Sequence, residues 1–449
     1  MTRIMVECPA DWFGGDDPTP LEVGRAYDTL LASSLRVARA TGLDAVESVA
    51  RRFHIDALRT PVRVRAPATL PTTAMLRPMA LRERHTMVIF GELGDALPPP
   101  VVLATLAQHG IIVHSDPVIG GFPVDMADPA VGTHGDVWKV HGGPELVARG
   151  LDGAGVHLAI VDTGLNLATL AAPSLPLLAA NGNWAPPGRT PGRMTEGHGS
   201  MCAFDARILA PKSTLVDCAV TSQQPTFPTV LSNALIAYEG LLNLLKGMPA
   251  HARALVINNS WGLVKAGDDD PPGSYSAGAH HPFTAKVREL TAAGADVVFA
   301  AGNFGDAREA TARGFADKTI CGANSDGSVI TVAGVDVSRQ RASYSSRGPG
   351  QLTAQKPDLA ACTHFWGYFG RTSTKQTTPD SGTSAACAVL SGLIAAIRTR
   401  YPAAKLSPAD LRRRLRDASR QPAGPAGFNL ELGAGVIDVP ALLGALPSP

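Results

Sequence analysis

Residues 157–166 read HLAIVDTGLN, a short apolar run that ends at an aspartate and a glycine. Four similar runs follow: TLVDCAV (214–220), ALVIN (254–258), DVVFAA (296–301) and SVITVAG (328–334). They are mostly continuous apolar runs rather than alternating ones, which is typical of strands buried on both faces of a sheet. Helical segments such as residues 229–246 and 284–294 lie between them. The pattern therefore predicts an α/β fold with a mainly parallel sheet flanked by helices.

The chain has 449 residues, of which 45% are apolar, and a formal net charge of +1. This length allows two or three domains, or one large domain with an appendage. The small net charge gives no general argument for binding nucleic acid or an anionic membrane. No apolar run approaches the roughly 20 residues that span a bilayer, and the N-terminus MTRIMVECPADWFGGDD lacks the apolar core of a signal peptide. We expect a cytoplasmic protein, or one secreted without a conventional signal peptide.

Three regions can be distinguished along the chain. Residues 1–80 are expected to form an extension, with a helix over about residues 21–53 and a Pro- and Thr-rich linker at 65–78. Residues 81–132 follow a β-α-β-β pattern (TMVIF, PPPVVLATLAQHG, IIVH and GGFPVDM), which predicts a small α+β domain. The alternating strands and helices occupy residues 137–445.

Neither a metal nor a cofactor is assigned. Six cysteines are scattered without a Cys-x-x-Cys pair, so we expect reduced, buried thiols and no zinc site. The acidic run Asp268-Asp269-Asp270 offers oxygen atoms of the kind that calcium binds. A solvated loop explains this run equally well, so calcium stays an open alternative.

Three polar residues stand at the ends of three predicted strands: Asp162, Ser260 and Asn303. In open parallel sheets, functional groups gather beyond the carboxyl ends of the strands, so we expect these residues to lie close together. His198 precedes a helical segment, and Ser384 lies at the start of a second helix that is rich in Ala and Gly. Free N–H groups and the helix dipole at that position favour a developing negative charge.

These residue types suit nucleophilic hydrolysis. A serine hydroxyl such as that of Ser384 is a poor nucleophile until a base removes its proton. A histidine such as His198 does so when a carboxylate such as Asp162 fixes its tautomer and supports the imidazolium. Asn303 lies in a turn bounded by glycines and offers a side-chain amide to an oxyanion.

Seven motifs, in order, resemble those of the subtilisin family of serine proteases (subtilases) over about residues 137–440. They are AIVDTGLN, GHGS, INNSWG, AAGNFG, SYSSRGP, KPDLAA and SGTSAA. The resemblance implies a subtilisin-like fold and a serine endopeptidase that works through an acyl-enzyme. Asp162, His198 and Ser384 would form the triad, and Asn303 with the Ser384 backbone N–H would stabilise the oxyanion.

The resemblance also implies two stretches that bind an extended peptide by main-chain hydrogen bonds. They are Ser260, Trp261 and Gly262, and Ala300, Ala301 and Gly302. Around the serine, we interpret Cys387 as a packed thiol and Asp380 as a surface or turn residue. The chain departs from the family pattern after GHG, where it reads SMCAF, and after GTS, where it reads AACA without the usual proline. These departures leave the triad intact but make substrate preference harder to transfer.

The stretch QHGIIVHSDPVIGGFPVDM (108–126) resembles the end of the family's inhibitory propeptide. This likeness implies a ferredoxin-like propeptide domain and a zymogen whose cleft stays blocked until cleavage near residues 127–136. The expected partners are a protein or peptide substrate and the chain's own N-terminal region, with neither nucleic acid nor membrane.

Three other interpretations remain. The triplets DTG (162–164) and DSG (380–382) also occur in aspartic proteases, whose paired carboxylates share a proton. The residues TTP before DSG do not form an apolar strand, which argues against that enzyme. A catalytically silent subtilase-fold protein that binds peptides is the principal alternative. A regulatory protein whose large N-terminal region is the functional part is the third.

Overall fold

The computed structural model describes residues 2–9, 29, 53–55, 59, 61–65, 85–93, 100–108, 111–124, 129–170, 178–222, 224, 227, 229–270, 274–369, 378–423 and 427–447. The helix expected over residues 21–53 and the linker expected over 65–78 lie almost entirely outside these ranges. Phe53, the expected end of that helix, instead begins a strand. Within the described ranges, no helix combines the length and apolar character that crossing a membrane requires.

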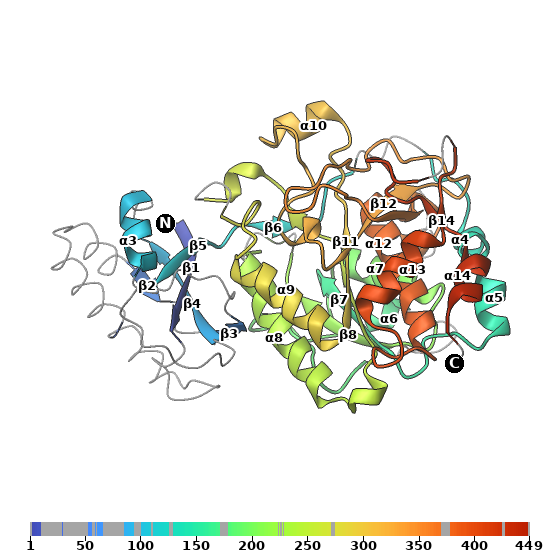
Figure 1. The fold of residues 1–449 in the computed structure, drawn as a ribbon, viewed down its shortest axis with the longest axis horizontal. Coiled ribbons are helices and arrows are strands. Elements are labelled where there is room, and N and C mark those ends of the chain that lie inside the picture. The colour runs from blue at the N-terminus through green and yellow to red at the C-terminus, as the bar shows by residue number, and fades with distance from the viewer. Residues whose placement is uncertain are drawn as a thin grey trace.

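An eight-stranded sheet lies at the centre of the larger part of the molecule (Figure 1). Its strands are β7 (His157–Asp162), β8 (Thr214–Ala219), β9 (Leu255–Asn259), β11 (Ala295–Ala300), β12 (Ile330–Val335), β13 (Leu359–Cys362), β14 (Ser419–Arg420) and β15 (Val436–Ile437). Their order is β14-β15-β13-β12-β11-β9-β7-β8, and neighbours are parallel except β14 and β15. Every residue of β9, β11, β12 and β13 is buried, which explains their continuous apolar character. The predicted mainly parallel sheet is confirmed.

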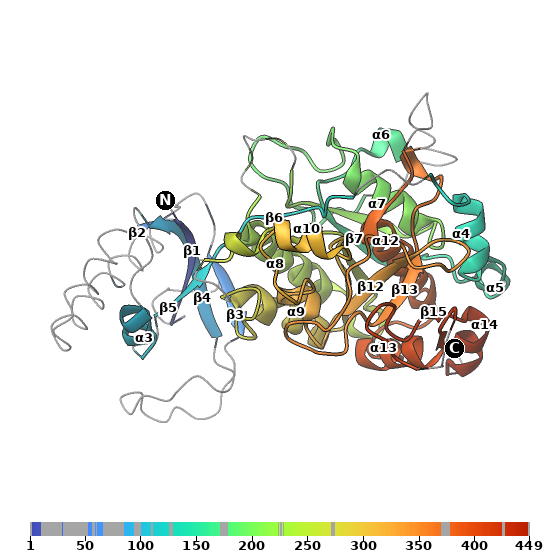
Figure 2. The ribbon, with the colours of Figure 1, turned by 90° about the horizontal axis from the view of Figure 1, so that it is seen from above.

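Two pairs of long helices pack on this sheet. The helix α7 (His198–Arg207) contacts α12 (Gly382–Arg398), which also lies across β9, β11 and β12. The helix α8 (Leu231–Gly247) contacts α9 (Pro282–Ala293), which packs on β11. Figure 2 shows the two pairs well apart, with strands between them. The other described helices of this larger part are α4 (His134–Val140), α5 (Gly143–Ala148), α6 (Leu167–Leu170), α10 (Ala307–Ala312), α13 (Pro408–Asp417), α14 (Val439–Ala445) and the 3-10 turns η2 (Ala250–Ala252), η3 (Ala266–Asp268) and η4 (Gly322–Ser325).

Two glycines allow the close backbone contacts that position α7. A Cβ atom on Gly392 in α12 would lie 2.0 Å from the carbonyl oxygen of Ala206 in α7. A Cβ atom on Gly199 would lie 2.4 Å from the carbonyl oxygen of Gly164, in the loop after β7. Larger side chains would force these backbones apart. The small residues of α7 and α12 therefore determine how close the first turn of α7 lies to the end of β7.

A second, antiparallel sheet belongs to the N-terminal part of the chain. It has the strand order β2-β4-β1-β5, with β3 also paired to β4. Its elements are β1 (Thr2–Pro9), β2 (Phe53–Ile55), β3 (Val62–Arg65), β4 (His85–Leu93), β5 (Ile112–Ser115) and the helix α3 (Pro100–Gln108). The sequence placed residues 1–80 in a separate extension, but β1 pairs with β4 along its whole length. The boundary at residue 80 therefore cuts through one sheet, and that prediction was wrong.

The segment after this sheet also differs from expectation. GGFPVDM was predicted to be the last strand of the small domain. The structure instead has a two-residue strand β6 (Ile119–Gly120), which pairs with β10 (Gly262–Leu263) of the larger part. Consecutive glycines at 120 and 121 offer no side chains to a domain core, whereas their backbone can pair closely with another chain segment.

Polar contacts join the small sheet to α8 and α9. The buried Lys286 of α9 donates to the carbonyl oxygen of Arg63 in β3 (2.5 Å) and to Glu239 and Glu289 (2.6 and 2.7 Å). Asp116, which follows β5, accepts hydrogen bonds from the backbone N–H and the hydroxyl of Ser232 (both 2.7 Å) in the first turn of α8. An acceptor at a helix N-terminus satisfies an N–H group that has no partner within the helix.

Candidate active site

The aspartate and the histidine predicted from the sequence lie in direct contact. Asp162 ends β7 and His198 begins α7. The Nδ1 atom of His198 is 2.7 Å from Oδ1 of Asp162. Because a carboxylate accepts at Nδ1, that nitrogen carries the proton and Nε2 remains free to act as a base. Burial lowers the pKa of His198, but the charge of Asp162 and the hydrogen bond to it outweigh this effect, so the pKa is raised.

Ser384 lies in the first turn of α12, where backbone N–H groups lack partners within the helix. Its hydroxyl donates to the carbonyl oxygen of Ser260 (3.3 Å) rather than to His198. The hydroxyl of Ser260 in turn donates to the carbonyl oxygen of Ser384 (3.2 Å). Ser260 thus holds the start of α12, and the hydroxyl predicted to be the nucleophile donates to the Ser260 carbonyl oxygen instead of to the predicted base.

Asn303 is buried and its amide has a fixed orientation. Its Oδ1 atom accepts from the backbone N–H and the hydroxyl of Thr383 (2.9 and 3.0 Å). Its Nδ2 atom donates to the carbonyl oxygen of Phe122 (3.1 Å). The side chain therefore presents a hydrogen-bond donor beside the serine-bearing turn, already bound to a peptide carbonyl. A fixed amide donor of this kind is what the oxyanion role predicted for Asn303 requires.

The two stretches predicted to bind substrate each place a glycine beside the ring of Phe122, and the space that this ring fills is here called the pocket. A Cβ atom on Gly262 would lie 2.5 Å from the Phe122 ring, and one on Gly302 would lie 3.5 Å from it. Ala300 and Ala301, which precede Gly302, are buried. Gly262 and Gly302 therefore leave room for an aromatic side chain between them, and they are here called the glycine walls.

Trp261 contributes to this pocket only through its backbone. Its indole is fully buried and packs on Phe283 and Phe299, with ring centroids 5.6 and 5.7 Å away. Its carbonyl oxygen accepts from Nδ2 of Asn324 (3.0 Å), which also donates to the carbonyl oxygen of Ala300 (3.1 Å). Asn324 thus links the stretch that contains Trp261 to the stretch that contains Ala300 through two hydrogen bonds.

Two residues beside Phe122, Asn324 and Phe304, were not predicted from the sequence. Phe304 meets the Phe122 ring edge-on, with centroids 5.5 Å apart. Asn324 lies in ICGANSDG, where no motif assigns a role to any single residue. Phe304 directly follows Asn303 in the sequence, and this adjacency alone could have indicated that Phe304 lies near the site.

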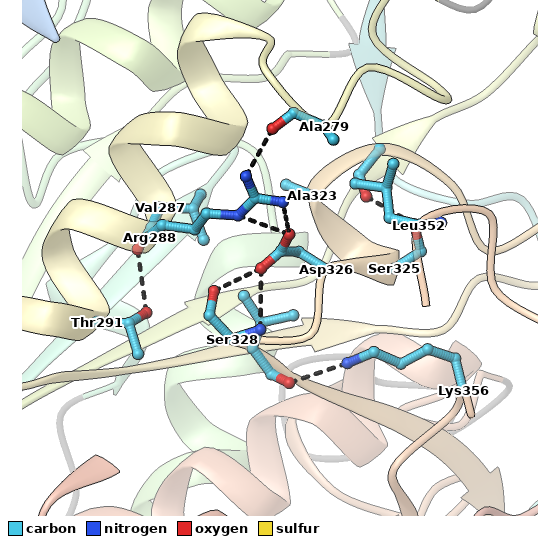
Figure 3. A network of polar contacts seen from close by, with 12 residues as sticks. Ala279, Val287, Arg288, Thr291, Ala323, Ser325, Asp326, Ser328, Leu352 and Lys356 are labelled. Atoms are coloured by element: carbon cyan, nitrogen blue, oxygen red, sulfur yellow. Dashed lines mark hydrogen bonds and ion pairs between the residues drawn. The ribbon is translucent and has the colours of Figure 1, made fainter. Parts of the chain in front are cut away.

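A polar network supports the turn that carries Asn324 (Figure 3). Asp326 directly follows η4 and accepts from Nε and Nη2 of Arg288 on α9 (2.9 and 2.5 Å). Its other oxygen accepts from the backbone N–H and hydroxyl of Ser328 (2.9 and 2.6 Å). The remaining Arg288 nitrogen donates to the carbonyl oxygen of Ala279 (2.6 Å). The turn that carries Asn324 is therefore fixed to α9 and to the residues just before β12.

Asp380 is buried, and its prediction as a surface or turn residue was wrong. It accepts from the backbone N–H groups of Tyr368 and Phe369. It also lies beside Asp205 of α7, and burial raises the pKa of both carboxyl groups. Two adjacent buried carboxyl groups share a proton more readily than they both ionise. The pair links the loop before Ser384 to the helix that begins at His198.

The cysteines near the site are packed thiols. All six cysteines are free and buried, as expected. Burial raises the pKa of Cys387 to about 12, so this thiol is protonated at neutral pH. The sulfur of Cys202 is 3.8 Å from Oδ2 of Asp162.

The acidic run 268–270 shows a structural role for its central residue. The oxygens of Asp269 accept from Ser115, Tyr275 and Ser276 at 2.6 to 2.8 Å. Among the described residues, the one group with three possible metal ligands close together is Asp162, His198 and Cys202. Its aspartate and histidine already bind each other, so we assign no metal there.

Comparison with known proteins identifies the family and the fold. A family model described as the subtilase family (Peptidase_S8) matches residues 153–435. The fold and this match define a serine endopeptidase. The chain belongs to the subtilase family, and the predicted family is confirmed. No curated protein matches the sequence.

Two solved structures share the fold. MycP1 from Mycobacterium smegmatis has a TM-score of 0.52 and 21% identity, covering 74% of this chain and 89% of its own. MycP1 from the ESX-1 type VII secretion system has a TM-score of 0.50 and 22% identity, covering 74% of this chain and 92% of its own. At this level of identity the likeness supports the fold alone.

Proposed function

We propose that residues 137–445 form the catalytic domain of an endopeptidase with Asp162, His198 and Ser384 as its triad. The hydrogen bond from Asn303 to a peptide carbonyl is the observation that carries this proposal, because it marks where a substrate carbonyl binds. The Ser384 hydroxyl attacks the carbon of that substrate carbonyl while His198 accepts the hydroxyl proton. Asn303 and the Ser384 backbone N–H stabilise the oxyanion, His198 protonates the leaving amine, and water then hydrolyses the ester.

The enzyme is made as a zymogen, with the small N-terminal domain as its inhibitory propeptide. The support for this is the backbone pairing of β6 with β10, which fills the cleft where an extended substrate would pair. The substrate is then a protein or peptide that replaces the N-terminal segment.

The test uses a chain that cannot keep its own segment in the pocket. Phe122→Asp puts a carboxylate between Gly262 and Gly302, where burial without a partner costs several kcal/mol. We expect this variant to hydrolyse a quenched fluorescent peptide that has Phe at the cleaved bond. Adding Ser384→Ala should lower kcat by about 10⁶, the loss measured when subtilisin loses its serine. Equal activity of the single and double variants would refute the assignment.

A catalytically silent peptide-binding protein is the second candidate. The observation in its favour is the hydrogen bond of the Ser384 hydroxyl to Ser260 rather than to His198. This candidate function predicts that the Phe122→Asp variant binds the same peptide without hydrolysing it, with binding measured by fluorescence anisotropy.

A further inference from the structure

The segment after β5 runs through the cleft as the middle strand of three. On one side, the N–H of Ile119 donates to the carbonyl oxygen of Thr229 (2.8 Å), and the N–H of Leu231 donates to that of Pro117 (3.0 Å). On the other side, Gly120 pairs antiparallel with Gly262. An extended peptide held by main-chain hydrogen bonds on both edges is bound as a substrate strand.

Phe122 occupies the position of the residue whose carbonyl is attacked. Its carbonyl oxygen is held by Asn303, and its ring lies between the glycine walls, edge-on to Phe304. The ring is nearly fully buried. The pocket is thus already filled by an aromatic side chain of this chain.

The residues before and after Phe122 lie beside the proposed catalytic groups. A Cβ atom on Gly121 would lie 3.9 Å from both Cε1 and Nε2 of His198, so a glycine passes directly beside the imidazole. A Cγ atom of Val124 would be 3.1 Å from a Cβ atom on Gly382, at the start of α12. The chain therefore passes the serine-bearing turn without a break, and the bond at the reacting position is Phe122–Pro123.

We propose that Phe122–Pro123 is held as the scissile bond of a bound substrate, and that Pro123 prevents its cleavage. This inference rests on the proposed function of Ser384 and His198. The pocket selects substrates in which the residue that contributes the attacked carbonyl is aromatic. Inhibition ends by displacement of the segment, or by a cut at another bond, and not by a cut at this one.

The chemistry of the leaving group explains the resistance. Attack by the Ser384 hydroxyl forms the Oγ–C bond to Phe122, and its proton passes to His198. The C–N bond then breaks only when His198 gives that proton to the nitrogen of residue 123. In proline this nitrogen carries a ring carbon in place of hydrogen. The ring crowds the approach of the imidazole, so the intermediate returns to the intact peptide.

This placement differs from the processing site expected from the sequence. Cleavage was predicted near residues 127–136, whereas the residue whose carbonyl meets Asn303 is Phe122. A cut near 127–136 by the same molecule would need the segment to leave the cleft and bind again in another register.

Replacing the proline tests the inference in the full-length chain. Pro123→Ala restores an ordinary amide nitrogen, so we expect fragments 1–122 and 123–449 in intact-mass spectra over time. The cut should be at least about 10²-fold faster than in wild type, the contribution expected of proton transfer to the leaving group. The matched control is Pro129→Ala, which removes a nearby proline outside the reacting position and should stay intact. Pro123→Ala with Ser384→Ala should also stay intact.

Each result decides the inference. Cleavage at 122–123 that requires both Pro123→Ala and Ser384 supports it. Cleavage of wild type at that bond overturns it, because the proline would then give no protection. An intact Pro123→Ala chain beside a Phe122→Asp chain that hydrolyses peptides overturns the inference and leaves the proposed function standing. If neither variant cleaves anything, the proposed function fails together with the inference.

Discussion

The side-chain amide of Asn303 donates to the carbonyl oxygen of Phe122 across 3.1 Å, although the two residues lie 181 positions apart in the chain. The hydrogen bonds from Thr383 to the other end of the Asn303 amide fix the donor before any substrate arrives. A preorganised donor costs no reorganisation when negative charge develops on the carbonyl oxygen. Under the proposed function, this one contact accounts both for stabilisation of the oxyanion and for closure of the cleft by the chain's own segment.

Removing this donor should slow the chemical step more than it weakens binding. In the Phe122→Asp background, we expect Asn303→Ala to lower kcat by about 10²–10³, the loss known for the oxyanion asparagine of subtilisin, with little change in KM. Asn303→Asp keeps the shape but removes the donor, so it should lose at least as much. Steady-state kinetics on a single peptide measure both constants. A rise in KM at unchanged kcat would contradict the role of Asn303.

The pH dependence should report the Asp162–His198 pair. His198 acts as a base only when neutral, so kcat/KM should rise with pH through its raised pKa. Asp162→Asn removes the charge that raises this pKa. The rise of kcat/KM with pH (its acid limb) should therefore move to lower pH, while the maximum of kcat/KM falls by about 10⁴. Profiles of Phe122→Asp and Phe122→Asp with Asp162→Asn provide the comparison. An acid limb at the same pH in both would show that another group controls it.

The glycine walls should select the residue at the cleaved bond. With peptides that differ only there, Phe122→Asp should prefer Phe over Asp by at least about 10², because the pocket would bury an unpaired carboxylate. Adding Gly262→Ala places a methyl group 2.5 Å from where the ring lies. It should reduce kcat/KM for Phe and spare a peptide with Ala at the cleaved bond. Equal losses for both peptides would indicate general damage instead.

The contact between α7 and α12 should tolerate no added side chain. Gly392→Ala would put its Cβ atom 2.0 Å from the carbonyl oxygen of Ala206, and we expect a stability loss of at least about 1–3 kcal/mol. Gly444→Ala in α14 meets nothing within 4 Å. There the higher helix propensity of alanine should leave stability unchanged or raise it by up to about 1 kcal/mol. Urea unfolding compares the two, and equal effects would argue against a close backbone contact.

The buried carboxyl pair should make the protein less stable as pH rises. Burial raises the folded-state pKa of Asp205 and of Asp380, so above the unfolded pKa the folded state binds more protons than the unfolded state. The stability that these protons provide is present at low pH and is lost as pH rises through the folded-state pKa. Asp205→Asn carries no titrating proton and should lose less stability between pH 5 and pH 8 than wild type. A loss as large as that of wild type would exclude the pair as the cause.

The positions of Asp162, His198, Asn303 and Ser384 could be predicted because each follows from a local pattern. Each residue lies at the end of a strand or the start of a helix, and the parallel sheet brings those ends to one edge. The motifs around them then identified the family, and the family match bears that out.

What the sequence could not show depends on partners far away in the chain. The strand β1 (Thr2–Pro9) pairs with β4 (His85–Leu93), which lies far along the chain. No local sequence pattern reveals this pairing. Asp380 lies in a turn-like sequence, and its partners Tyr368, Phe369 and Asp205 come from other parts of the chain. GGF looked like a strand of its own domain, because nothing in three residues tells which edge their backbone will join.

The most direct test of the central claim is the rate at which a fluorophosphonate probe labels Ser384, read by peptide mass spectrometry. If Ser384 is activated and Phe122 closes its cleft, we expect slow labelling of wild type and fast labelling of Phe122→Asp at Ser384. Phe122→Asp with Ser384→Ala should not be labelled. Equal rates in wild type and Phe122→Asp, or a label on any residue other than Ser384, would contradict the claim.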